Sequence, residues 1–141
     1  MKVGTILSLI MIGMLVFLAG IGIMRFLGDA DVGKLLAENN CGVCHDMTAR
    51  QKHGKGPYLW EIYNRPAGVV DFPFSPGFKK LTTETPFLWD EDHLDRWLID
   101  PVAFIPQNKM VQHTKDHPLS FDGIKSAANR KDLIVYLKTL R

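Results

Sequence analysis

The sequence predicts an all-α protein, in which a domain of helices and long loops follows a single N-terminal transmembrane helix. An uncharged run near the N-terminus is long enough to cross a bilayer. Further along the chain, apolar residues recur at helical spacing in three segments, and no segment shows the alternation typical of strands. We therefore divide the 141 residues into an anchor, residues 1–28, and one domain, residues 29–141.

The anchor is predicted from the 22 uncharged residues between Val3 and Met24, which are bounded by Lys2 and Arg25. As a helix this run spans about 33 Å, and a hydrocarbon core is about 30 Å thick. A cleaved signal peptide is the alternative, but its apolar region is shorter, about 7 to 15 residues. We expect an uncleaved helix that crosses the lipid bilayer through residues 3–24. Roughly six residues link it to the domain, too few for a long flexible tether.

Three helices are expected in the domain. The first follows Asp29 and Asp31, whose carboxylates suit a helix N-terminus. Its apolar positions are Val32, Leu35 and Leu36. The second spans Trp89 to Leu98 and stops before Asp100-Pro101. The third takes up roughly the last dozen residues, where these apolar positions recur at helical spacing: Leu133, Ile134, Tyr136, Leu137 and Leu140.

Long loops rich in glycine and proline separate these helices, notably Gly54–Ser75 and Asp100–Asp122. Loops of this length are uncommon in a domain of roughly 110 residues. They indicate that something other than side chains fills part of the core.

The charge balance excludes one class of function. Beyond residue 28 the chain carries 15 basic and 15 acidic side chains, so the domain is neutral. A nucleic-acid-binding domain has a clear basic excess, and we expect no nucleic-acid partner. Two cysteines are also too few for a scaffold held together by disulfides.

The two cysteines belong to the motif Cys41-Gly-Val-Cys44-His45, which is typical of c-type haem attachment. Two thiols at this spacing can form thioethers with the vinyl groups of one porphyrin, and the adjoining imidazole then becomes an axial ligand. A redox-active cysteine pair would need a βαβ context, and a zinc site would need further ligands such as His113 and His117. We expect one haem c, bound covalently through Cys41 and Cys44, with His45 as an iron ligand.

Haem attachment also predicts the location of the domain. The charges that flank the anchor nearly balance, so they do not decide its orientation. Covalent haem is attached on the outer side of an energy-coupling membrane. We therefore expect a single-pass protein of the cytoplasmic (inner) membrane, with a cytoplasmic N-terminus and a periplasmic haem domain.

The sixth iron ligand is sought among the remaining methionines and histidines. Outside the anchor the methionines are Met47 and Met110, and Met47 is only two residues beyond His45, on the same side of the porphyrin. Met110 lies in a long proline-containing loop that can reach the opposite face, and we predict it as the ligand. A thioether ligand would give a fairly high reduction potential and a closed, six-coordinate iron. A second histidine is the alternative: His53, His93, His113 or His117.

At this point the chain resembles the class I c-type cytochromes, in particular the mitochondrial and alphaproteobacterial cytochrome c group. The resemblance covers Asp29 to Arg141. It rests on Gly33, eight residues before Cys41, on the C-terminal run Asp132 to Lys138, and on the turn Gly56-Pro57. It implies the class I cytochrome c fold, with helices packed around one covalent haem.

The resemblance also implies roles for individual residues. The carbonyl of Pro57 would accept the imidazole N–H of His45 and strengthen that ligand. Arg65 and Trp89 would lie near the haem propionates. Trp97 and Asn108 would lie near the methionine ligand.

The chain departs from the family in several places. Ala37 stands where a bulky aromatic is usual, Trp97 replaces a tyrosine, and Asn108 replaces a threonine. Nine residues, 112–120, are inserted after the methionine loop and carry two histidines, a lysine and an aspartate. We expect this insertion to contact a specific partner.

These observations predict an electron-transfer protein and not an enzyme. The expected function is a membrane-anchored monohaem cytochrome c that carries single electrons between membrane-bound respiratory or photosynthetic complexes. Its partners would be a quinol:cytochrome c oxidoreductase, a terminal oxidase or similar complexes. A fixed haem subunit of one larger oxidoreductase is the alternative, followed by a five-coordinate haem sensor or enzyme.

Overall fold

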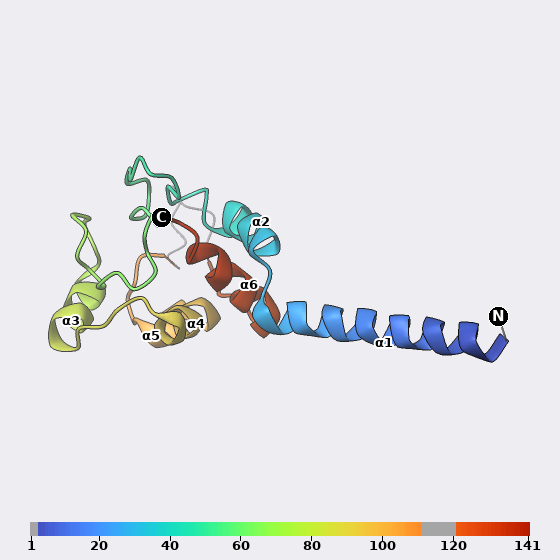
Figure 1. Ribbon diagram of the computed structural model, residues 1–141. Coiled ribbons are helices and arrows are strands. Elements are labelled where there is room, and N and C mark those ends of the chain that lie inside the picture. Colours follow the sequence, from blue (N-terminus) through green and yellow to red (C-terminus); the bar gives the residue numbers. More distant parts are fainter. Residues whose placement is uncertain (1–2, 111–120) are drawn as a thin grey trace.

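The computed structural model describes residues 3–110 and 121–141 (Figure 1). Its helices are α1 (Val3–Leu27), α2 (Ala30–Asn40), α3 (Pro76–Glu84), α4 (Glu91–Ile99), α5 (Pro101–Phe104) and α6 (Ala127–Leu137). Within these residues there is no strand, and β-type pairing is limited to an isolated antiparallel bridge between Pro66 and Leu88. The all-α prediction is confirmed for the described part of the chain.

The three predicted helices of the domain are present, with shifted ends. The first is α2, capped by Asp29. The second is α4, which begins at Glu91 instead of Trp89 because the Asp90 carboxylate accepts the His93 N–H as an N-cap. The third is α6, which begins early, at Ala127 after the Ser126 cap, and ends at Leu137.

Two short helices, α3 and α5, were not expected. Ser75 caps α3, and Pro76 occupies its first turn, where the missing N–H costs nothing. Asp100 caps α5 by accepting the N–H groups of Val102 and Ala103. The predicted loop over Asp100–Asp122 was therefore wrong at its start. With four residues, α5 is too short to show an apolar period, whereas α3 is as long as α4 but has only Phe78 and Leu81 as large apolar residues.

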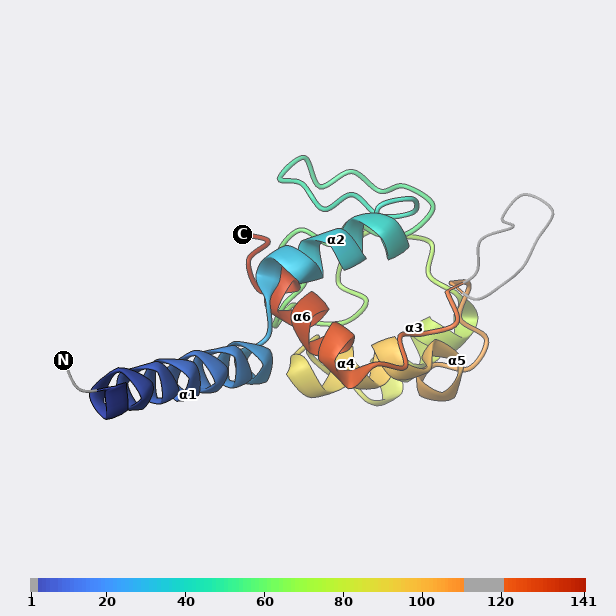
Figure 2. The ribbon, with the colours of Figure 1, turned by 90° about the vertical axis from the view of Figure 1, so that its right-hand side faces the viewer.

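The core forms where α2 crosses α6 (Figure 2). At the crossing, a Cβ on Gly33 would overlap the Asp132 carbonyl and lie 2.8 Å from the Cβ of Tyr136, so only glycine permits this approach. Ala37 is fully buried on the same face of α2. Its small side chain lets the buried residues Leu133, Ile134 and Leu137 of α6 pack close to α2.

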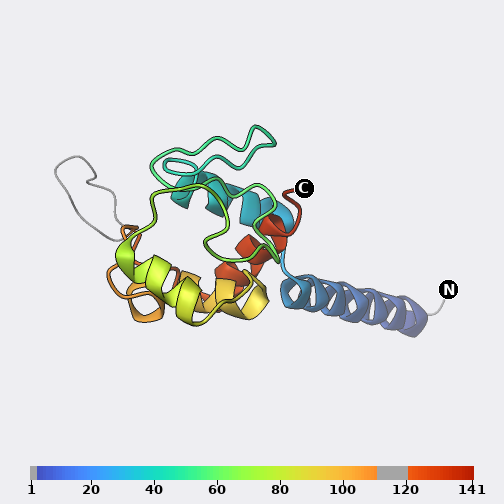
Figure 3. The ribbon, with the colours of Figure 1, turned by 90° about the vertical axis from the view of Figure 1, so that its left-hand side faces the viewer.

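Helix α1 projects away from the remainder of the molecule in all three views (Figures 1, 2 and 3). Its apolar side chains between Ile6 and Ile21 are exposed. Among the described residues, none of the helices combines the length and the apolar character needed to span a bilayer. The transmembrane anchor over residues 1–28 stays a prediction. The inserted residues 112–120, with His113 and His117, lie outside the described residues.

Candidate haem site

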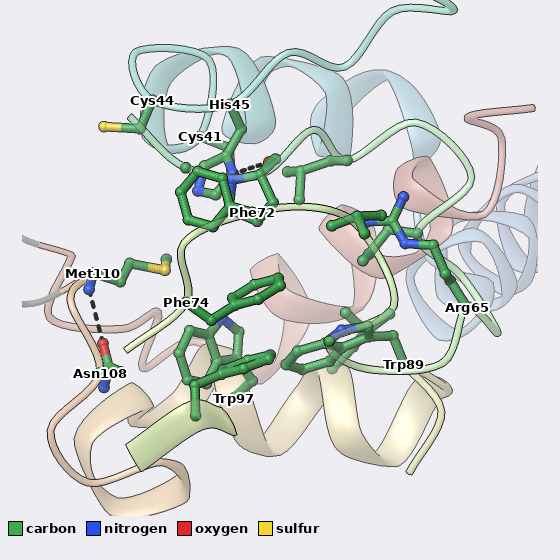
Figure 4. A pocket seen from close by; sticks show the side chains of 18 of the residues that line it. Cys41, Cys44, His45, Arg65, Phe72, Phe74, Trp89, Trp97, Asn108 and Met110 are labelled. Atoms are coloured by element: carbon green, nitrogen blue, oxygen red, sulfur yellow. Dashed lines mark hydrogen bonds between the residues drawn. The ribbon is translucent and has the colours of Figure 1, made fainter. Parts of the chain in front are cut away.

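A cavity of about 310 Å³ lies between the Cys41–His45 segment and the helices α3 and α4 (Figure 4). Its walls are mainly apolar. Every residue predicted for the site lines it: Cys41, Cys44, His45, Pro57, Arg65, Trp89, Trp97, Asn108 and Met110. The fold thus brings together side chains that are up to 69 positions apart in the sequence, as Cys41 and Met110 are.

The motif turns sharply at the end of α2. The Cys41 N–H still donates to Ala37 as the C-cap, and the N–H groups of Cys44 and His45 donate to the Cys41 carbonyl over 3.0 and 2.9 Å. The two thiols are not joined in a disulfide. Burial, with a smaller contribution from Cys44, raises the pKa of the Cys41 thiol to about 12. A redox-active pair would need a βαβ context, and the described residues form no strand, which disfavours that alternative.

The imidazole of His45 is oriented by a hydrogen bond to the turn at Pro57. Its Nδ1 donates a hydrogen bond to the Pro57 carbonyl over 2.6 Å, as the resemblance implied. Burial lowers the pKa of the imidazole, and the bond to Pro57 opposes this effect. The ring is therefore neutral, and Nε2 is the nitrogen left to bind a metal. Gly56 makes the contact possible, because a Cβ there would lie 2.7 Å from Nδ1.

Met110 is brought to the cavity by a loop that Asn108 holds. Asn108 is 3% exposed, and its Nδ2 donates to the carbonyls of Pro101 and Ile105, each over 2.9 Å. Its Oδ1 accepts the Met110 N–H over 3.0 Å (Figure 4). The side-chain amide of Asn108 thus bonds only to the backbone of its own loop. These bonds fix the position of the Met110 backbone, from which the thioether side chain extends.

The alternative ligands are placed elsewhere or lie outside the described residues. Met47 packs against the hydrophobic core and does not line the cavity. His53 and His93 do not line it either. His113 and His117 fall in the part of the chain that the structure does not describe.

Arg65 and the two tryptophans occupy the walls away from the cysteines (Figure 4). The Arg65 guanidinium donates to the carbonyls of Trp60 and Tyr58, each over 2.9 Å, and stays charged at neutral pH although burial lowers its pKa. Trp89 is buried, and its ring centroid lies 5.8 Å from that of Trp97. The Arg65 guanidinium and the indole N–H of a tryptophan are both donors, and together they suit an anionic group such as a carboxylate.

The sequence interpretation missed an aromatic wall of the cavity. Phe72, Phe74 and Phe78 line it, and the rings of Phe74 and Phe78 stack with centroids 4.4 Å apart. These residues lie in the predicted loop Gly54–Ser75 and in the unexpected helix α3. The density of phenylalanines between residues 72 and 78 was the signal that could have revealed them.

The donor set fits a covalent haem. Two thiols, a neutral imidazole and a thioether share one apolar cavity, which matches the attachment and axial ligands of haem c. Within the described residues, no cluster of three or more histidine, cysteine, aspartate or glutamate side chains could bind a metal ion. The zinc alternative would need His113 and His117, which are not described.

Comparison with known proteins decides the family. No family model matches the chain. Cytochrome c2 iso-2 of Magnetospirillum molischianum is 41% identical over 115 residues, which cover 80% of this chain and 99% of that protein. Cytochrome c of Euglena viridis is 32% identical over 116 residues, which cover 81% and 99%. The chain belongs to the cytochrome c family.

The solved structure of cytochrome cH from Methylobacterium extorquens supports the same assignment. It is 34% identical and superposes with a TM-score of 0.64, covering 79% of this chain and 99% of that protein. The predicted class I cytochrome c fold of the domain is thereby confirmed. Members of this family are electron-transfer proteins and not enzymes, and they carry one covalent haem c. In this cytochrome c the haem is attached through Cys41 and Cys44.

Proposed function

We propose that this cytochrome c is anchored in the cytoplasmic (inner) membrane by α1, with its haem domain on the periplasmic side. It carries single electrons between membrane-bound respiratory or photosynthetic complexes, such as a quinol:cytochrome c oxidoreductase and a terminal oxidase. The observation that carries this proposal is that His45 and Met110 both line the cavity, so that two protein ligands are available for one iron. An iron with two protein ligands has no open position for a substrate, which suits electron transfer.

Each residue of the site has a part in this function. Bound haem c supplies a one-electron iron couple. His45 and Met110 would be the two protein ligands of the iron, and Pro57 orients the imidazole through its carbonyl. Arg65 and Trp89 would hold the propionates. Trp97 and Asn108 support the methionine side of the site.

The aromatic and aliphatic walls exclude water from the site. A dry, rigid surrounding keeps the two ligands in the same places in both oxidation states. This lowers the structural change that accompanies each electron and allows fast transfer.

Two features of α1 support the membrane anchor. The uncharged run from Val3 to Met24 lies within one continuous helix of 25 residues. Its large apolar side chains are uncovered along most of its length, including Leu9, Ile10 and Leu15, each more than 60% exposed. An apolar surface this long is costly in water and suits lipid.

A fixed haem subunit of a larger oxidoreductase is the second candidate. It is favoured by the junction between α1 and α2, which is only two residues long. Such a short junction limits how far the haem domain can travel from its anchor.

The membrane anchor is tested by extraction. Membranes that contain the full-length protein are washed with sodium carbonate at high pH, and haem-stained protein is followed in pellet and supernatant. We expect the protein to stay in the pellet and to leave it only with detergent. Release by carbonate alone would refute the anchor.

The electron-transfer role is tested by spectroscopy and by partners. We expect the ferric protein to show the weak long-wavelength band of sulfur-ligated haem and to bind added imidazole slowly. Rapid imidazole binding would favour the five-coordinate sensor. Copurification with a single complex in mild detergent, at a stoichiometric ratio, would favour the fixed subunit.

A further inference from the structure

The junction between α1 and α2 is shorter than the sequence indicated. Because α1 continues to Leu27 and α2 begins at Ala30, only Gly28 and Asp29 connect them. Gly28 has a φ of +81°, a conformation that strains other residues. A Cβ at Gly28 would lie 2.9 Å from Val135 Cγ2 and 3.3 Å from Lys131 Cγ. The junction is thus packed tightly against α6.

Hydrogen bonds hold the second residue of the junction. The Asp29 N–H donates to the Asp132 carboxylate on α6 over 2.8 Å. The Asp29 carboxylate in turn accepts the N–H groups of Asp31 and Val32 over 2.9 and 3.2 Å. Since Asp132 also lies at the α2–α6 crossing beside Gly33, the junction is tied to the most tightly packed part of the domain.

Apolar side chains are uncovered on both sides of this junction. Leu27 at the end of α1 is 63% exposed, and Val32 and Leu35 on α2 are 40% and 60% exposed. Val32 and Leu35 are three positions apart and share one face of α2, whereas Gly33 and Ala37 on another face are buried. We call Leu27, Val32 and Leu35 the junction surface.

We propose that the junction surface is seated in the interfacial layer of the bilayer, and that the Gly28–Asp29 junction thereby holds the haem domain in one orientation on the membrane. This rests on the membrane anchor of the proposed function. Leu27 ends the apolar helix α1, and Val32 is only five residues beyond it in the sequence. Because Gly28 and Asp29 are packed on α6, they move with the haem domain, and no free segment remains between α1 and the domain. Lys34 on the same helix pairs with Glu38 over 3.9 Å, so apolar contact and not charge would seat the junction surface in the bilayer.

The fixed orientation has a consequence for electron transfer. The haem cavity would stay at one height and one angle above the bilayer, so only partners that present a docking face at that height can be reached. Helix α5 lies at the end of the domain remote from α1 and remains in water (Figures 1 and 2).

The experiment measures the depth of single nitroxide labels. Cys41 and Cys44 are consumed by the haem thioethers, so an introduced cysteine is the labelled thiol. Labels are placed with Leu35→Cys on the junction surface, Val102→Cys on α5 (49% exposed) and Leu15→Cys in α1 (64% exposed). Full-length, reduced holoprotein is reconstituted in vesicles of equal parts phosphatidylcholine and phosphatidylglycerol. Collision rates with oxygen and with a water-soluble nickel chelate are then recorded.

We expect Leu15→Cys to report lipid, Val102→Cys to report water, and Leu35→Cys to be several-fold less accessible to the nickel chelate than Val102→Cys. If Leu15→Cys reports lipid while Leu35→Cys is as accessible as Val102→Cys, the junction surface is in water and this inference is wrong, although the anchor stands. If Leu15→Cys reports water, the anchor itself fails, and the inference fails with it.

A second variant tests the junction. A flexible Gly/Ser insertion of about ten residues after Gly28 frees the domain from α1. We expect the label at Leu35 to become as accessible as the one at Val102, while the label at Leu15 is unchanged. If the label at Leu35 keeps its depth in this variant, the junction is not what holds the domain.

Discussion

The His45 Nδ1 donates to the Pro57 carbonyl over 2.6 Å, and Gly56, next to Pro57, leaves room for the imidazole. The bond keeps the proton of the imidazole on Nδ1. Because Gly56 has no side chain, the backbone of the turn can approach the imidazole closely. The ligand is therefore positioned by a turn that lies 12 residues along the chain.

This relationship predicts the effect of Gly56→Ala. The new Cβ would collide with the imidazole and push His45 out of position. We expect the yield of haem-containing protein to fall several-fold, measured by haem staining against total protein. Gly20→Ala is the control, because a Cβ at Gly20 meets nothing within 4 Å, and it should leave the yield unchanged.

Met110→Ala tests the sixth ligand. The haem should stay attached, because the thioethers are untouched, but the potential should fall and the long-wavelength band should vanish when the thioether is lost. Redox titration and the ferric spectrum measure both effects. Met47→Leu is the control, since Met47 does not line the cavity. A Met110→Ala protein with the wild-type spectrum would exclude Met110 as the ligand.

Asn108→Ala tests the support of the methionine loop. The variant leaves the Met110 N–H without its acceptor and removes the side-chain donor to the carbonyls of Pro101 and Ile105, which keep their backbone N–H partners. We expect a loss of about 1–3 kcal/mol in the free energy of unfolding, and faster binding of added imidazole because Met110 is held less firmly. Asn129→Ala, at an exposed position of α6, is the matched control and should change neither quantity. Normal imidazole binding in Asn108→Ala would show that Asn108 has no role in positioning Met110.

The ion pair between Arg130 and Asp95 joins α6 to α4. Its Nε–Oδ1 distance is 2.7 Å, and the Arg130 side chain, 9% exposed, also donates to the carbonyls of Ile124 and Lys125. Because Asp95 is partly exposed, we expect Arg130→Ala to cost about 2–3 kcal/mol in denaturant unfolding, below the range for a fully buried pair. The exposed pair Lys34–Glu38, 3.9 Å apart, is the comparison, and Lys34→Ala should cost about 0.5 kcal/mol or less. Equal losses in the two variants would contradict this ranking.

Stability should depend on the ionisation of Asp90. Hydrogen bonds from the backbone and side chain of His93 hold the pKa of this carboxyl below its ordinary value. A lowered pKa means that the stabilisation is present above the ordinary value and is lost as the pH falls through the lowered one. Asp90→Asn keeps an N-cap oxygen but has no carboxyl to protonate. As the pH is lowered from 5 to below the ordinary carboxyl pKa, we expect the Tm of this variant to fall less than the Tm of the wild type. Parallel Tm curves for the two proteins would argue against a contribution from Asp90.

The cofactor and the main helices were predictable from the sequence because they depend on local chemistry. The five residues of the motif Cys41-Gly-Val-Cys44-His45 are sufficient to predict covalent haem attachment. The apolar periods of α2, α4 and α6 are also local, so each helix was found, while its ends depended on caps such as Asp90 and Ser126. Gly33 was singled out by its spacing, and the structure shows the backbone contact with Asp132 that requires it.

Contacts between distant segments were decided only by the tertiary structure. The sequence left Met110 and four histidines as possible ligands, and the fold brings Met110 to the cavity while His53 and His93 stay outside its lining. The phenylalanines of residues 72–78 stand close together in the sequence, but the stacking of Phe74 on Phe78 in the cavity wall and the packing of Gly28 against Val135 depend on the fold. A periodic pattern reports which face of one helix is apolar, but which segment covers that face depends on loop closure and on packing across the whole chain.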